Sequence, residues 1–238
     1  METKQNHIGI IGLGVMGLNL AQNISNQGFK IAGFERDPAL IKAARSIKTN
    51  INIFDDIIAF INGIEKPKKI LLMITAGDPV DEVINYLQKY LSSGDVIIDG
   101  GNSHYKDSLT RQQQLLKLGI NYIGLGISGG ADGARFGPAI MAGGSINSYR
   151  TIEPILTKVA ARTDNKEICA SHLGESAAVG HFVKMIHNGI EYADMQIISE
   201  TYDFLSKGMG YSEIESAKVF KEWSSSELSS FLIDISVS

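Results

Sequence analysis

The sequence predicts an α/β protein: a Rossmann-like, doubly wound, mainly parallel sheet followed by the beginning of an all-helical domain. The sheet is predicted because short apolar runs alternate with helical patterns from residue 7 onward, and glycine-rich turns follow several of these runs. The helical domain is predicted by the pattern beyond Ser176, which is helical almost to the end. We therefore expect a sheet domain over residues 1–177 and a helical part over 178–238, with the boundary near 175–180.

Composition narrows the functional classes. The 238 residues are 20% charged and 44% hydrophobic, as in globular proteins, and the net charge of −4 gives no reason to expect nucleic acid or an anionic membrane as a partner. The N-terminus lacks a signal-peptide pattern, and no apolar run reaches the roughly 18 residues of a membrane span, so we expect a cytoplasmic location. Cys169 cannot form an internal disulfide and is expected to be a small buried hydrophobic residue. No metal site is expected.

The chain begins with a strand, a glycine turn, a helix and a second strand. The apolar run 7–11 is followed by G-L-G-V-M-G at Gly12–Gly17, a helical stretch over 15–26 and a second apolar run over 29–34. In this order, G-x-G-x-x-G is typical of a dinucleotide-binding fold. The first glycine would permit the tight turn, the second would let a pyrophosphate approach the backbone, and the third would let the helix pack close to the strand.

The residues after the second apolar run bear on which dinucleotide binds. They read Glu35-Arg36-Asp37-Pro38. An acidic side chain at this point hydrogen-bonds a ribose 2′-hydroxyl and repels a 2′-phosphate, whereas an arginine attracts the phosphate. Because both types are present, these residues alone leave NAD and NADP open. Pro38 is expected to open the next helix.

The alternation continues along the sheet domain. Strands are expected at 69–74, 95–99 and 121–125, with helices at 79–91 and 107–118 between them. Parallel strands bring their carboxyl ends to one edge of a sheet, where ligands bind. The turns expected at that edge are Ile74-Thr75-Ala76-Gly77, Asp99-Gly100-Gly101-Asn102-Ser103 and Ser128-Gly129-Gly130. Each could be a simple chain reversal, but together they could offer backbone N–H groups and short polar side chains to a carboxylate or a sugar.

The remainder of the sheet domain gives weaker signals. The glycine-rich segment 126–144 has little helical character. A short strand is expected within it, at 139–142. A helix is expected at 147–161 and a further strand at 168–172. The short basic turn Lys66–Lys69 is expected to be a solvated loop.

The stretch Gly180–Tyr192 is predicted to belong to one long helix, because it lacks proline and continues into 193–205. One side of this helix collects polar side chains suited to acid/base chemistry: Lys184, His187, Asn188 and Glu191, with Tyr192 at the border. The opposite side collects the apolar residues expected to face a core: Phe182, Val183, Ile186, Ile190 and Ile197. Lysine and glutamate seven residues apart are also common on a solvated face, so the polar stripe alone leaves both interpretations open.

Four motifs resemble the 6-phosphogluconate dehydrogenase family, over essentially the whole chain. They are G-L-G-V-M-G-L-N-L-A-Q-N at 12–23, I-I-D-G-G-N-S at 97–103, G-I-S-G-G-A-D-G-A-R-F-G-P at 126–138 and H-F-V-K-M-I-H-N-G-I-E-Y at 181–192. The first is shared with all β-hydroxyacid dehydrogenases, and the last is much more specific. The resemblance implies oxidative decarboxylation of 6-phosphogluconate to ribulose 5-phosphate and CO₂ with NADP, in the pentose phosphate pathway and gluconate utilization.

The resemblance also assigns roles. It implies that Lys184 takes a proton from the substrate C3 hydroxyl as hydride leaves for the nicotinamide, and that Glu191 protonates the enediol at C1 after CO₂ is lost. The family's substrate-binding positions match Asn102, Ser128, Gly129, Gly130, His187, Asn188 and Tyr192. Its cofactor-binding positions match Gly12, Leu13, Gly14, Val15, Met16, Gly17, Glu35, Arg36, Asp37, Ile74, Thr75, Ala76 and Asn102. A lysine base must be partly neutral and a carboxyl acid partly protonated, which an enclosed site favours.

Three departures from the family pattern matter. NADP-binding members typically have Asn-Arg-Thr where this chain has Glu35-Arg36-Asp37, and a lysine where it has Thr75. We favour NADP, with NAD or dual use as the alternative. The family also continues beyond F-L-I-D-I-S-V-S through a large helical domain that builds a homodimer and completes the substrate pocket. We therefore expect this sequence to be a fragment or a truncated product.

Two other functions stay open. The chain could be a non-catalytic NADP-binding module that turns over nothing. It could also be a related β-hydroxyacid dehydrogenase that acts on a short unphosphorylated acid such as 3-hydroxyisobutyrate. Such enzymes keep the glycine turn and the helix lysine, but the run from His187 to Tyr192 disfavours this alternative.

Overall fold

The computed structural model describes residues 5–47 and 49–237 as two compact units. Residues up to Met185 form the first unit, and residues from Ile186 onward form the second. Within the described ranges, no helix combines the length and the apolar character needed to cross a membrane.

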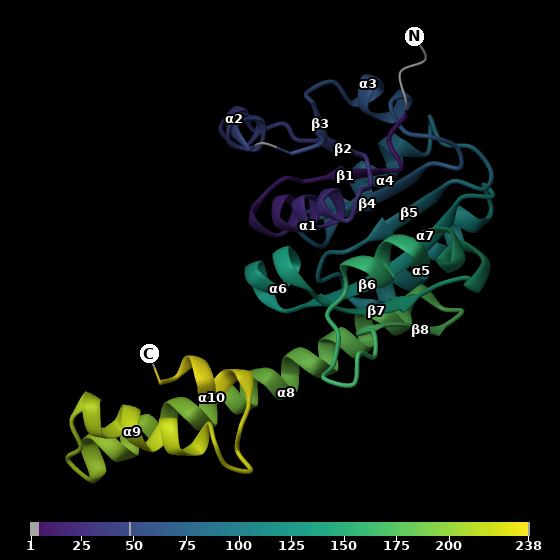
Figure 1. Cartoon of the computed structure of the whole chain (residues 1–238). Coiled ribbons are helices and arrows are strands. Elements are labelled where there is room, and N and C mark those ends of the chain that lie inside the picture. The colour runs from purple at the N-terminus through teal and green to yellow at the C-terminus, as the bar shows by residue number, and fades with distance from the viewer. Residues whose placement is uncertain (1–4, 48, 238) are drawn as a thin grey trace. The chain divides into compact units, whose positions relative to one another are not determined.

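The first unit is built on an eight-stranded sheet with the strand order β3-β2-β1-β4-β5-β6-β7-β8, which can be followed in Figure 1. The strands are β1 (Ile8–Ile11), β2 (Ile31–Phe34), β3 (Ile51–Phe54), β4 (Lys69–Leu72), β5 (Val96–Asp99), β6 (Asn121–Ser128), β7 (Ala139–Gly143) and β8 (Ala170–Gly174). Neighbouring strands are parallel except for β6 and β7, which are antiparallel. The central strands β1, β2, β4 and β5 are buried along their whole length, which explains their continuous apolar runs.

Helices cover both faces of this sheet. They are α1 (Val15–Asn26), α2 (Pro38–Ser46), α3 (Ile57–Asn62), α4 (Asp78–Leu87), α5 (Tyr105–Leu116), α6 (Gly130–Phe136) and α7 (Ile146–Val159). Buried side chains of α1, α6 and α7 join one hydrophobic cluster, and those of α3, α4 and α5 join another. Adjacent strand residues divide between the two clusters: Ile97 belongs to one, and Ile98 to the other. The predicted doubly wound, mainly parallel architecture is confirmed.

Three local predictions for the first unit need correction. Strand β3 and helix α3 were not predicted. Strand β6 continues to Ser128 instead of ending at residue 125. The glycine-rich segment contains helix α6, although its sequence has little helical character. Tertiary packing compensates, because Ala134 is fully buried and its carbonyl accepts a hydrogen bond from Asn23 Nδ2 at 3.1 Å.

The basic turn before β4 is also different from the solvated loop that was expected. Lys68 is only 7% exposed, and its Nζ donates to the carbonyl oxygens of Ile61 at 2.7 Å and Ile64 at 3.2 Å. These carbonyls lie at and just beyond the end of α3, where backbone acceptors lack helical partners. Burial lowers the pKa of the Lys68 ammonium. The lysine therefore caps a helix instead of facing solvent.

The second unit is helical. It contains the later part of α8 (Ala177–Asp203), a π-helical turn η1 (Phe204–Gly208), α9 (Glu213–Trp223) and α10 (Phe231–Ile235). Ser212 and Glu215 form a capping box at the start of α9. The small core of this unit consists of the buried residues Leu205, Phe220 and Ile233.

The apolar side predicted for the Gly180–Tyr192 helix is not the side that it buries. Phe182, Ile186, Ile190 and Ile197 are 40%, 45%, 60% and 61% exposed. In the first unit α8 instead buries Ala177, Gly180, His181 and Lys184. Small residues allow this arrangement, because a Cβ on Gly180 would collide with the carbonyl oxygen of Gly124 and stand 2.7 Å from that of Met141. The prediction was wrong because close backbone packing, and not apolar bulk, sets the buried face.

Candidate active site

A cleft of about 720 Å³ opens at the carboxyl ends of β1, β2 and β4. Six of the residues predicted to bind the cofactor line it: Gly12, Gly14, Glu35, Arg36, Ile74 and Thr75. The wall also includes residues that sequence reasoning missed: Leu40, Ile57, Pro79, Glu82, Val83 and Tyr86. Most of these lie on α2 and α4, the helices that directly follow the predicted turns after β2 and β4. The apolar periodicity of those helices was the signal that could have identified them.

The glycine turn fits a dinucleotide's phosphates. Gly12 has φ +94°, which favours glycine, and a Cβ there would collide with the carbonyl oxygen of Met73. A Cβ on Gly14 would meet nothing within 4 Å, so the backbone at this point is open to a ligand. Gly14 is also the N-cap of α1 and supplies no side-chain hydrogen bond, which leaves first-turn N–H groups available to an anion.

Glu35 ties the glycine turn to the end of β2. Its Oε2 accepts a hydrogen bond from the Leu13 N–H at 2.9 Å, and its Oε1 accepts from the N–H groups of Arg36 at 2.7 Å and Asp37 at 3.1 Å. The Asp37 side chain has a different task, since it caps α2 by accepting from the Ala39 N–H at 2.7 Å. A fixed carboxylate therefore lies where a dinucleotide's ribose hydroxyls are recognised, with the Arg36 side chain beside it in the cleft wall.

The other predicted turns follow the neighbouring parallel strands β4, β5 and β6, as expected. Thr75 and Asn102 are exposed, whereas Ser128 at the end of β6 is buried. Gly129 and Gly130 both have positive φ and begin α6. These turns place the small polar side chains of the predicted substrate residues along one edge of the sheet.

Lys184 lies in the first unit and is 8% exposed. Helix α8 approaches β6 closely here, since a Cβ on Gly126 would stand 2.7 Å from the Cβ of Lys184. Gly126 lies two residues before Ser128 on the same strand. The lysine therefore starts against β6, near the end of the strand that carries the predicted substrate turn.

The four remaining predicted residues of the helix belong to the second unit. His187 Nδ1 lies 3.5 Å from Glu191 Oε2, and each of these side chains is 37% exposed. Asn188 is half-buried, and Tyr192 is 71% exposed. Helix α8 is continuous from Ala177 to Asp203, so it carries all four together with Lys184.

A buried polar cluster behind the β5 turn was missed by sequence reasoning. We define it as Asp99, Ser103, Arg111, Tyr122 and His181, none of which is more than 6% exposed. Burial and the adjacent Asp99 carboxylate raise the pKa of Tyr122, so its hydroxyl keeps its proton. Burial lowers the pKa of His181, so its ring is neutral near pH 7. Burial opposes the charge of Arg111, but its interactions with Asp81 and Tyr122 together outweigh burial, and the net change raises the guanidinium pKa.

Other candidate chemistry is weak. Cys169 is half-buried instead of fully buried as expected, because it lies just before the edge strand β8. Its N–H donates to the Ala161 carbonyl at 2.9 Å, and its carbonyl accepts from the Ile140 N–H at 2.7 Å. Across the part of the chain that the structure describes, no three His, Cys, Asp or Glu side chains gather in a way that could hold a metal ion.

Comparison with known proteins matches two family models. Residues 7–174 match the NAD binding domain of 6-phosphogluconate dehydrogenase, and residues 180–238 match the C-terminal domain of the same enzyme. These matches cover both units and include the glycine turn, the three sheet-edge turns and Lys184.

Individual relatives agree. The decarboxylating 6-phosphogluconate dehydrogenase of Synechocystis is 47% identical over 234 residues, covering 96% of this chain and 48% of the relative. The NAD(+)-dependent decarboxylating enzyme of Bacillus subtilis is 47% identical over 232 residues, covering 97% and 49%. A Plasmodium falciparum 6-phosphogluconate dehydrogenase, solved in apo form and with NADP+ or 6-phosphogluconate, superimposes with a TM-score of 0.89 at 39% identity, covering 97% and 50%. The chain thus spans about half the length of the relatives it matches. It belongs to the 6-phosphogluconate dehydrogenase family.

Proposed function

We propose that this chain carries the cofactor-binding and acid/base part of a decarboxylating 6-phosphogluconate dehydrogenase that uses NADP, with NAD as the alternative cofactor. The observation that carries the proposal is that Lys184, buried against β6, belongs to the helix that matches the family. The dinucleotide cleft and the turns after β4, β5 and β6 supply the binding groups. The related proteins include both NADP-binding and NAD-dependent enzymes, so both cofactors remain in the proposal.

The mechanism assigns one task to each side chain. The bound cofactor supplies the hydride acceptor for C3 of the sugar acid. The amine of Lys184 takes the proton of the C3 hydroxyl as hydride leaves C3, and the hydroxyl at C3 becomes a ketone. The 3-keto acid loses its carboxyl carbon as CO₂ while the Lys184 ammonium returns its proton to the C3 oxygen, which gives an enediol. The carboxyl of Glu191 then protonates the enediol carbon that becomes C1 of ribulose 5-phosphate, and the hydroxyl on C3 gives its proton back to Lys184 as the ketone forms. Asn102, Ser128, Gly129 and Gly130 hold the acid, together with His187, Asn188 and Tyr192.

The whole protein is part of the proposal. We expect it to act as a homodimer in the cytoplasm on 6-phosphogluconate, without a nucleic acid or membrane partner. The domain boundary near 175–180 stays a prediction. The chain covers about half of each relative's length. The second candidate function is a dinucleotide-binding module that does not turn over substrate, and the cleft beside the glycine turn supports it.

The test separates these functions. The chain is mixed with NADP and 6-phosphogluconate, and NADPH formation is followed by absorbance, while NADP binding is measured by calorimetry. We expect turnover, which Lys184→Met abolishes while leaving NADP affinity within about twofold. Lys117→Met, at an exposed lysine beyond the end of α5, is the matched control and should change neither quantity.

Two results would contradict parts of this proposal. NADP binding without any turnover by the unmutated chain would leave the non-catalytic module as its function. Near-normal turnover in Lys184→Met would remove Lys184 from the mechanism.

A further inference from the structure

The buried polar cluster is organised around the Asp99 carboxylate, which is fully buried at the end of β5. Its Oδ2 accepts hydrogen bonds from Ser103 Oγ and Tyr122 Oη, both at 2.6 Å. Its Oδ1 accepts from the Gly101 N–H at 3.1 Å. Asn102 lies between Gly101 and Ser103 in the turn. The carboxylate therefore accepts a hydrogen bond from the backbone of the residue before Asn102 and one from the side chain of the residue after it.

Arg111 connects this turn to the preceding one. Its Nη1 donates to Ser103 Oγ at 3.1 Å and lies 3.5 Å from Asp99 Oδ2. Its Nη2 donates to the Gly77 carbonyl at 3.1 Å, which closes the turn after β4. Asp81 on α4 accepts from Nε at 2.7 Å and from Nη2 at 2.9 Å, so the guanidinium is held in a bidentate pair.

His181 connects Asp99 to α8, the helix that carries Lys184. The Asp99 carbonyl oxygen lies 3.1 Å from His181 Nε2, and only an N–H at Nε2 can donate to it. The neutral ring then accepts at Nδ1 from Ser108 Oγ, which lies 2.6 Å away on α5. His181 precedes Lys184 by three residues on α8, which is about one helical turn. A neutral histidine thus fixes the turn of helix that precedes the proposed base.

We propose that Asp99, Arg111 and His181 are positioning residues that hold the Asn102 turn and the Lys184 turn of α8 in one fixed arrangement before ligands bind. All the contacts lie within the first unit. Three of the links end at segments that carry predicted ligand residues: the turn after β4, the turn that holds Asn102, and the turn of α8 before Lys184. Burying ionic groups rarely adds stability over apolar packing, so their use here calls for another reason. The inference rests on the proposed function for the roles of Asn102 and Lys184.

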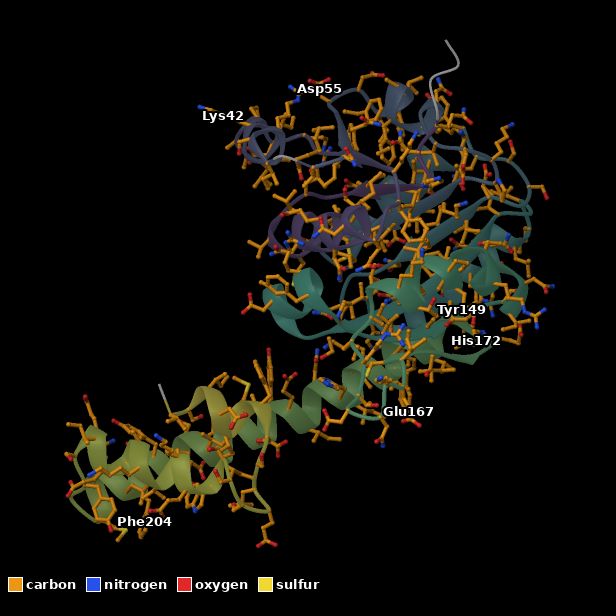
Figure 2. The ribbon with its side chains drawn as sticks, in the orientation of Figure 1. Lys42, Asp55, Tyr149, Glu167, His172 and Phe204 are labelled. Atoms are coloured by element: carbon orange, nitrogen blue, oxygen red, sulfur yellow. The ribbon has the colours of Figure 1, made fainter. Side chains whose placement is uncertain are left out.

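The test uses His181→Leu, which removes both ring hydrogen bonds, and His181→Gln, which restores a side-chain N–H donor. Tyr122→Phe, which removes the hydroxyl that donates to Asp99 Oδ2, is a second variant that deletes a single polar atom. Tyr149→Phe is the matched control, because Tyr149 is also buried, at 4% exposure, but its ring packs at a tilt against His172, with centroids 5.1 Å apart (Figure 2). Hydrogen exchange of residues 100–103 in the ligand-free chain and affinities for 6-phosphogluconate and NADP are measured well below the unfolding temperature.

We expect His181→Leu and Tyr122→Phe to speed exchange at 100–103 and to weaken 6-phosphogluconate binding about tenfold each. The affinity for NADP should change less than threefold, because Asn102 is the one predicted cofactor residue in the loosened turn, whereas the glycine turn and Glu35 are held separately. His181→Gln should recover most of the loss, and Tyr149→Phe should match the unmutated chain.

The outcomes distinguish the inference from the function beneath it. Unchanged exchange at 100–103 in both cluster variants would overturn the inference, whether or not they unfold at a lower temperature. Equal losses in His181→Gln and His181→Leu would overturn the role of the donor hydrogen bond. An unmutated chain that binds no 6-phosphogluconate would contradict the proposed function, while the exchange rates would still decide whether the cluster orders the turn.

Discussion

Two glycines on the same helix should respond to alanine in opposite ways. Both Gly180 and Gly189 lie inside α8, and helix propensity alone predicts that alanine would stabilise each by about 1 kcal/mol. A Cβ on Gly180 would stand 2.7 Å from the Met141 carbonyl oxygen, about 0.7 Å inside the 3.4 Å at which ordinary contact begins, and would collide with that of Gly124. A Cβ on Gly189 would meet nothing within 4 Å.

The cost at Gly180 can be worked from these contacts. The obstructing atoms belong to the backbones of β6 and β7, so they cannot rotate away as a side chain could. The first turns of α8 must move instead, which loosens the packing of Ala177, His181 and Lys184. Overpacking of this kind costs about 1–3 kcal/mol and sometimes more, so we expect a net loss near 2 kcal/mol for Gly180→Ala. In a unit of this size that corresponds to roughly 4–8 °C in Tm.

The assay must report each unit separately. Trp223 is the single tryptophan and lies in the second unit, so its fluorescence follows that unit during urea unfolding, while hydrogen exchange in β6 and β7 follows the first. Gly180→Ala should lower protection in β6 and β7, and Gly189→Ala should raise the urea midpoint of the fluorescence transition. Equal or greater stability of the first unit in Gly180→Ala would refute the close backbone approach.

Three further predictions concern charge. Glu35→Asn removes a negative charge from the cleft and should raise the affinity ratio of NADP over NAD about tenfold in calorimetry; an unchanged ratio would exclude Glu35 from cofactor choice. Arg111→Met leaves Asp99 buried without its cation and should cost about 3–5 kcal/mol in urea unfolding, whereas a loss under 1 kcal/mol would contradict the buried pair. Burial lowers the pKa of His181 below the ordinary 6.5, so the unfolded chain takes up a proton first and stability should fall as pH drops below about 6.5. His181→Gln should weaken the dependence of stability on pH below about 6.5. An identical dependence in the variant would show that His181 is not its source.

Six residues that the sequence singles out by local signals line one cleft in the structure. Gly12 and Gly14 meet backbone requirements that appear as a fixed spacing, and Pro38 opens α2 as expected. The parallel order follows from the alternation of strands and helices. These features depend on a few neighbouring residues, so one sequence is enough to recognise them.

The buried polar cluster could not be predicted in the same way. Arg111 and His181 resemble surface residues in any sequence pattern, and only the fold brings them to Asp99, which is 12 and 82 residues away. The buried face of α8 was missed for a related reason, because Gly180 reads as a weak point in a helix until the backbone of Gly124 is placed against it. Helix α6 likewise depends on partners outside its own segment, such as Asn23.

The N-terminus of α1, which has no side-chain cap, makes the stability of the fold depend on the concentration of a bound ligand. Gly14 caps that helix without a side chain, so first-turn amides are left to water until an anion binds. A ligand that binds only the folded state adds stability by mass action, about 2.7 kcal/mol when its free concentration is 100 times its Kd. Because a cell degrades chains in proportion to their unfolded fraction, the amount of this protein should rise when the dinucleotide is plentiful and fall when it is scarce.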